Sequence, residues 1–113
     1  MRVRLLVLGA IVAGCGGEST PPTPTAAAEI VTVGDIFSPT FTDINVGETV
    51  RWSFAAGSDG QGHNVRFNPR ITGSPADISV HATGSVTRVF PDTGTFKYDC
   101  DVHPGMKGEI TVH

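Results

Sequence analysis

Residues 95–106 read TFKYDCDVHPGM and join a short alternating segment to a compact turn. In the alternating segment Phe96, Tyr98 and Cys100 fall on one side of an extended chain, because successive side chains of a β-strand point to opposite faces. The two aromatic residues would therefore enter a core. We expect Cys100 to lie at the inner end of this strand, where the turn begins.

The turn after Cys100 carries two further side chains that could bind a metal. His103 and Met106 follow at intervals of three residues, and Pro104-Gly105 breaks the strand pattern and folds the chain back. A thiolate, an imidazole and a thioether are ligands that suit copper. The turn supplies three of four ligands, so a second histidine has to come from elsewhere in the chain.

His63 is the candidate for that fourth ligand. It begins a second alternating segment, in which His63, Val65 and Phe67 share one face. If this strand pairs antiparallel with residues 95–100, its start lies beside the end of the other strand. His63 and Cys100 then meet at one end of the domain, where two rigid strands preorganise the site.

The remainder of the C-terminal region also consists of short β-type runs separated by Gly, Pro, Asp and Asn. About seven or eight such strands without a helical period indicate an all-β sandwich or barrel. The strands that the pattern predicts are 30–33, 40–46, 49–54, 63–67, 85–90, 95–100 and 109–113. Within residues 68–84 the pattern leaves the structure open, although 77–81 could form a further short strand or a turn.

The N-terminus, residues 1–15, reads as an export signal. Arg2 and Arg4 precede an apolar run over residues 5–13, which is too short to span a bilayer, since that takes about 20 residues. The run ends in small residues before Cys15, and this resembles the lipobox of bacterial lipoproteins, in which the cysteine is lipidated after cleavage. An ordinary secretory signal with an incidental cysteine is the alternative.

Residues 16–28 read GGESTPPTPTAAA and predict a linker, because they lack large apolar side chains. The linker either holds the following domain, residues 29–113, away from a membrane surface or is a tail with no spacing role. With the lipobox, it leads us to expect an exported protein anchored by lipid to a bacterial membrane. The domain would face the periplasm or the cell exterior.

The cysteine count favours a metal-bound thiol, and the net charge argues against one class of partner. The chain has two cysteines, and if Cys15 carries lipid, Cys100 has no disulfide partner in a compartment that oxidises thiols. A bound metal would occupy that thiol. Without Arg2 and Arg4, six basic residues stand against eleven acidic ones, and no basic patch occurs, which argues against a nucleic-acid partner.

The pattern YxCxxHxxM at residues 98–106, followed by KGEITV at 107–112, resembles the C-terminal signature of the cupredoxins. With HNV at 63–65 and VGETVRW at 46–52, the resemblance covers residues 29–113. The short spacing between the histidine and the methionine is similar to that of amicyanin- and pseudoazurin-like members. The resemblance implies a Greek-key β-sandwich with one type 1 copper ion. Its ligands would be His63 Nδ1, Cys100 Sγ, His103 Nδ1 and a distant Met106 sulfur.

The function that this resemblance implies is the transfer of single electrons between larger redox proteins by a monomer. Four protein ligands leave no open position for a substrate, so we expect no enzyme activity at the metal. By the same analogy His103 is partly exposed and forms the electron port with Pro104. The backbone N–H of Asn64 would bond the cysteine sulfur and tune the potential.

Other functions of the same residues remain open. The main alternative is a copper carrier or storage protein with the same ligands, although such proteins favour Met-rich or His-rich open sites. A cysteine nucleophile activated by His63 or His103 would lack an orienting third group. A binuclear copper site would need a second cysteine in the turn, and zinc on the same ligands would give a colourless protein. Four nearby residues are expected to face solvent: His81, His113, Asp99 and Asp101.

Overall fold

A computed structural model describes residues 25–113 of the chain. These residues form nine strands and no helix, which confirms the all-β fold, and none of their segments is a helix long and apolar enough to cross a membrane. The predicted signal with Cys15, and the linker up to residue 24, lie outside the described residues. The strands are β1 (Ala28–Val33), β2 (Ile36–Ser38), β3 (Phe41–Ile44), β4 (Thr49–Ser53), β5 (His63–Phe67), β6 (Ile78–His81), β7 (Ser85–Val89), β8 (Gly94–Asp99) and β9 (Lys107–Val112).

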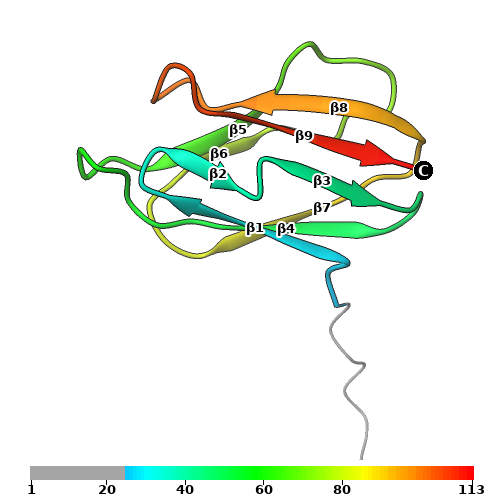
Figure 1. Cartoon of the computed structure of the whole chain (residues 1–113), viewed down its shortest axis with the longest axis horizontal. Coiled ribbons are helices and arrows are strands. Elements are labelled where there is room, and N and C mark those ends of the chain that lie inside the picture. Colours follow the sequence, from blue (N-terminus) through cyan, green and yellow to red (C-terminus); the bar gives the residue numbers. More distant parts are fainter. Residues whose placement is uncertain (1–24) are drawn as a thin grey trace, which may run out of the picture.

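The strands form two sheets that pack face to face (Figure 1). One sheet has the order β2-β1-β4-β7, and the other has the order β3-β9-β8-β5-β6. The chain changes sheet between β2 and β3, on either side of β4, and again on either side of β7. Such crossings are typical of Greek-key sandwiches, the architecture that the sequence led us to expect.

Nine strands form where about seven or eight were predicted, and β2 is the strand that the prediction missed. It has only three residues, of which Phe37 alone is buried, so it is too short to display alternation. The turn Gly34-Asp35 joins it to β1, and Gly34 has a φ of 60°, as tight hairpin turns require. In the interval that the pattern left open, residues 78–81 form strand β6.

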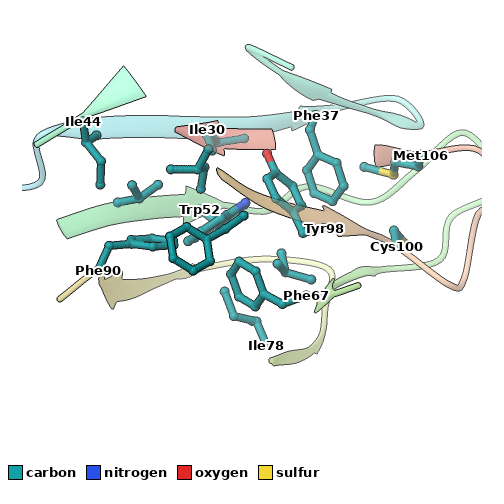
Figure 2. Packing of buried hydrophobic residues seen from close by; sticks show 14 of the residues in the cluster. Ile30, Phe37, Ile44, Trp52, Phe67, Ile78, Phe90, Tyr98, Cys100 and Met106 are labelled. Atoms are coloured by element: carbon teal, nitrogen blue, oxygen red, sulfur yellow. The ribbon is translucent and has the colours of Figure 1, made fainter. Parts of the chain in front are cut away.

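The core between the sheets is built around Trp52, which is fully buried. Its ring contacts Tyr98, Phe67 and Phe90 with centroid distances of 5.5, 6.1 and 6.5 Å. The pairs with Tyr98 and Phe67 are edge-to-face, and such pairs add to the free energy gained from apolar burial. Figure 2 shows this aromatic cluster in the middle of the core, with Cys100 and Met106 at the same end of it.

The pairing of β5 with β8 decides what lies at that end. The two strands are antiparallel, with Arg66 opposite Asp99 and Phe67 opposite Tyr98. The start of β5 therefore lies beside the residue that follows β8. In Figure 1 the β8–β9 loop, the β4–β5 loop and the β1–β2 turn gather at one end of the sandwich, away from the C-terminus. We call this the loop end.

Candidate metal centre

Three buried donor side chains meet at the loop end. The Sγ atom of Cys100 lies 4.0 Å from Nδ1 of His63 and 3.8 Å from Nδ1 of His103. The exposed fractions of these residues are 2% for Cys100, 0% for His63 and 8% for His103. Within residues 25–113 Cys100 is a free cysteine, and the three residues form one cluster of potential metal-binding atoms that all lie within 4.8 Å of one another. The antiparallel pairing predicted from alternation thus brings His63 to Cys100.

These distances fit a shared metal ion. A sulfur at about 2.3 Å and a nitrogen at about 2.0 Å from one centre, at trigonal angles, lie about 3.7 Å apart. The two sulfur–nitrogen distances are close to that value. The donor set, two imidazoles and a thiolate in one plane, is the trigonal set of blue-copper sites. The residues therefore fit a type 1 copper ion.

Met106 completes the set from the same turn. It is buried, with 2% of its surface exposed, and it lies at the same end of the core as Cys100 (Figure 2). The backbone N–H of Cys100 donates to the carbonyl of Met106 at 2.9 Å, and the N–H of Met106 donates to the carbonyl of His103 at 3.1 Å. These two bonds close the turn on itself, so the three ligands it carries are held together before any metal binds.

The two histidines differ in their electrostatic surroundings. Burial lowers the pKa of His63, and the charge of His103 lowers it further. His63 is therefore held neutral, as a metal ligand must be. His103 instead has a carboxylate beside its ring: the Nε2 atom lies 2.9 Å from Oδ1 and 3.0 Å from Oδ2 of Asp59. The hydrogen bond with Asp59, and next the contact with Cys100, raise the pKa of His103 to about 9.

Asp59 and Asp35 are the residues near the site that sequence reasoning missed. Asp59 lies in the β4–β5 loop, and its pKa is lowered chiefly by the hydrogen bond with His103. Asp35 lies in the β1–β2 turn, 3.7 Å from Nε2 of His103, and hydrogen bonds from Ser58 lower its pKa. Neither stands at a motif spacing from the ligands, so only the fold reveals them. They also cover the ring that was expected to be partly exposed, and His103 is buried.

We predict that the metal-free protein loses stability as the pH rises from about 6.5 to about 9. His103 has a pKa of 6.5 in an unfolded chain and about 9 in the fold, so its stabilising contribution is complete below 6.5 and disappears above 9. The opposite contribution of His63, whose pKa is lowered, develops only below 6.5. The slope will be shallow, because the Asp59 side chain is 43% exposed.

Urea denaturation of the metal-free protein across this pH range measures the slope. The variant Asp59→Ala should flatten it, because the ring then loses its anionic partner. A free energy of unfolding that rises with pH in this window would contradict the prediction.

Asn64 links the two halves of the site. Its side-chain Oδ1 accepts the backbone N–H of Asp101 at 3.0 Å, which ties the start of β5 to the ligand turn. The bond from its own backbone N–H to the cysteine sulfur stays a prediction. Arg66 of β5 forms ion pairs with the same region at the surface. Its guanidinium nitrogens lie 2.9 Å from Oδ1 of Asp99 and 3.8 Å from Oδ2 of Asp101.

The remaining predicted residues are not part of the donor cluster within the described residues. Pro104 is exposed beside His103. His113 is exposed and lies 3.1 Å from Asp43. His81 is only half-buried, and its ring stacks on Phe54 at a centroid distance of 5.3 Å. Both of these histidines stay outside the donor cluster within the described part of the chain.

Comparison with known proteins gives the same result as the geometry. Residues 30–113 match the model of the family described as copper binding proteins, plastocyanin/azurin family. A plastocyanin from Scenedesmus fuscus is 36% identical over 87 residues, which cover 68% of this chain and 86% of that protein. The solved structure of amicyanin from Paracoccus versutus superposes with a TM-score of 0.66 at 24% identity, over 80% of this chain and 85% of the other.

A larger enzyme also contains this fold. The copper-containing nitrite reductase of Thermus scotoductus superposes with a TM-score of 0.68 at 26% identity, over 89% of this chain but only 25% of that chain. The chain thus matches a quarter of the length of that protein. The family match over residues 30–113 and the plastocyanin relative, together with the donors at the loop end, lead to one conclusion: the chain belongs to the plastocyanin/azurin family of copper-binding proteins.

Proposed function

We propose that the protein carries single electrons between larger redox proteins, using one type 1 copper ion. The observation that carries this proposal is the buried set of His63, Cys100 and His103, with Met106 from the same turn. Copper held by these residues would supply one-electron chemistry between Cu(II) and Cu(I).

The chain's own contribution to electron transfer is rigidity. His63 is fixed at the start of β5 and Cys100 directly after β8, and the hydrogen-bonded turn holds His103. Donors that cannot move keep the same geometry in both oxidation states, which favours fast transfer. The four donors leave no open position for a substrate, so we propose a carrier and not an enzyme.

We place the electron port at the loop end. Pro104 is exposed there, and His103, the residue before it, keeps a small exposed fraction. A redox partner that docks on this surface would come nearest to the site through the His103 ring. We propose that the protein docks as a monomer.

The second candidate function is copper carriage or storage with the same donors. Burial argues against it, because the donors come from strand β5 and from the turn after β8, and the fold would have to open to release the ion. Comparing two rates separates the functions: electron self-exchange of the copper-loaded protein and copper transfer to an excess of chelator. We expect electron exchange to be much the faster. Copper transfer faster than electron exchange would favour the carrier.

We further propose that the protein is exported and anchored by a lipid on Cys15. Support comes from the sequence alone, in the apolar run over residues 5–13 and the small residues before Cys15. Expression in a bacterial host with labelled palmitate tests this proposal. Label is expected on the wild-type chain and not on Cys15→Ser, and an unlabelled wild-type chain would contradict the anchor.

A further inference from the structure

The outer nitrogen of the His103 ring is paired with a carboxylate instead of facing open solvent. Nε2 lies within 3.0 Å of both oxygens of Asp59, and the His103 side chain is 9% exposed. Asp35 is farther away, at 3.7 Å, and its oxygens are engaged by the backbone N–H and the hydroxyl of Ser58. Asp59 is therefore the acceptor that the ring nitrogen meets.

The β4–β5 loop is built to hold this carboxylate against the ring. The N–H of Gln61 donates to Oδ1 of Asp59 at 3.0 Å. The loop is closed by two backbone bonds, from Gly57 N–H to the carbonyl of Gln61 at 2.8 Å and from Gly60 N–H to the carbonyl of Gly57 at 2.9 Å. The contact with His103 is thus part of an ordered turn.

Gly57 shows how closely this turn approaches the ring. A Cβ atom at that position would lie 2.6 Å from Oδ1 of Asp35 and 3.0 Å from Nε2 of His103. A Cβ atom at this position would displace the Asp35 carboxylate and would contact the ring more tightly than most real Cβ atoms do, so glycine at residue 57 favours this close approach of the loop. Ser58 then fastens the same loop to Asp35 in the β1–β2 turn.

When it binds a metal, the His103 imidazole is neutral and carries one N–H, and the partner of the ring decides which nitrogen carries it. If Nε2 donates to Asp59, the lone pair of Nδ1 is left on the side that faces the sulfur of Cys100, 3.8 Å away. A carboxylate in this position fixes the tautomer and orientation of a metal-binding histidine and makes it a stronger donor. The negative charge of the carboxylate also favours Cu(II) over Cu(I).

We propose that Asp59 is a positioning residue for His103, which orients the ring toward the metal site and lowers the reduction potential of bound copper. The inference rests on the proposed function in that His103 serves as a copper ligand. The hydrogen bond itself is testable without copper.

The first experiment measures solvent exchange of the His103 Nε2–H by NMR in the metal-free protein. We expect exchange at least tenfold faster in Asp59→Ala than in the wild type, and little changed in Asp43→Ala. The control removes a carboxylate from an equivalent contact, with Nε2 of His113, away from the site. Equal exchange in Asp59→Ala and the wild type would overturn the proposal, whether or not the protein binds copper.

The second experiment measures the reduction potential of the copper-loaded protein. Asp59→Ala should lower the ratio of Cu(II) to Cu(I) affinity about tenfold, which raises the potential by about 59 mV. Asp59→Asn keeps an acceptor oxygen without the charge, so it should preserve slow Nε2–H exchange and still raise the potential. Asp35→Asn removes a charge at 3.7 Å and keeps an acceptor oxygen for Ser58, so it should have a smaller effect. If Asp35→Asn raised the potential as much as Asp59→Ala does, the two carboxylates would act only through their charge, and the positioning role would be overturned.

Discussion

Replacing Cys100 with alanine should abolish the blue colour of the copper-loaded protein completely. The Sγ atom of Cys100 lies within 4.0 Å of Nδ1 of both histidines and is the donor whose thiolate gives an intense charge-transfer band with Cu(II). Removing a residue that only hydrogen-bonds a metal ligand typically weakens metal binding about 10–100-fold. Loss of the ligand Cys100 itself should weaken copper binding by more than that. Visible absorption and a competition titration with a chelator measure the two effects.

The other cysteine provides the matched control for this variant. Cys15→Ala removes a thiol that lies outside the described domain, so the colour and the copper affinity should remain those of the wild type. The metal-free Cys100→Ala protein should still unfold cooperatively, because a small side chain replaces another at a buried position. A blue band that survives in Cys100→Ala, or disappears in Cys15→Ala, would contradict the assignment.

Gly108→Ala should destabilise the fold by about 1–3 kcal/mol, a large share of the stability of a small domain. Gly108 lies opposite Tyr98 in the β8–β9 pair, and a Cβ atom there would overlap the Tyr98 ring. The ring cannot move aside freely, because Tyr98 is only 1% exposed. Its ring packs against Phe37 and Trp52, with centroid distances of 4.9 and 5.5 Å. Urea denaturation of the metal-free protein measures the loss.

A double-mutant cycle isolates the overlap between these two residues. Tyr98→Leu removes the atoms that the new Cβ would meet, so Gly108→Ala should cost less in that background than in the wild type. Costs that add to within about 0.5 kcal/mol would show that the overlap is not the cause. Because Tyr98 is two residues before Cys100, we also expect Gly108→Ala alone to broaden the visible absorption band of the copper-loaded protein.

The sequence predicted the parts of the fold in which side-chain alternation is long enough to read. One alternating segment begins at His63 and spans five residues, and the other ends at Cys100 and spans six. In both, every second residue is buried. Alternation therefore sufficed to place both ligands on inner faces, and antiparallel pairing brought them to one end. The turn from residue 101 to 106 could be interpreted from its Pro-Gly pair and ligand spacing alone.

What the sequence could not predict depends on short segments and distant contacts. β2 has one buried residue, Phe37, although the pair Gly34-Asp35 before it was a usable hairpin signal. The contact between Asp59 and His103 joins residues 44 positions apart, and an aspartate in a Gly-rich loop reads as an ordinary turn residue. Only the folded arrangement of three separate loops places that carboxylate on the ring.

The visible spectrum of the metal-free protein titrated with Cu(II), followed by reduction and reoxidation, tests the central claim most directly. We expect one equivalent of copper to produce a strong thiolate-to-Cu(II) band that disappears on one-electron reduction and returns on oxidation. The donors His63, Cys100 and His103 already lie at distances suited to the ion, so the band should appear without unfolding of the domain. A protein that binds copper without this band, or that stays colourless and inactive in redox titration, would contradict the account.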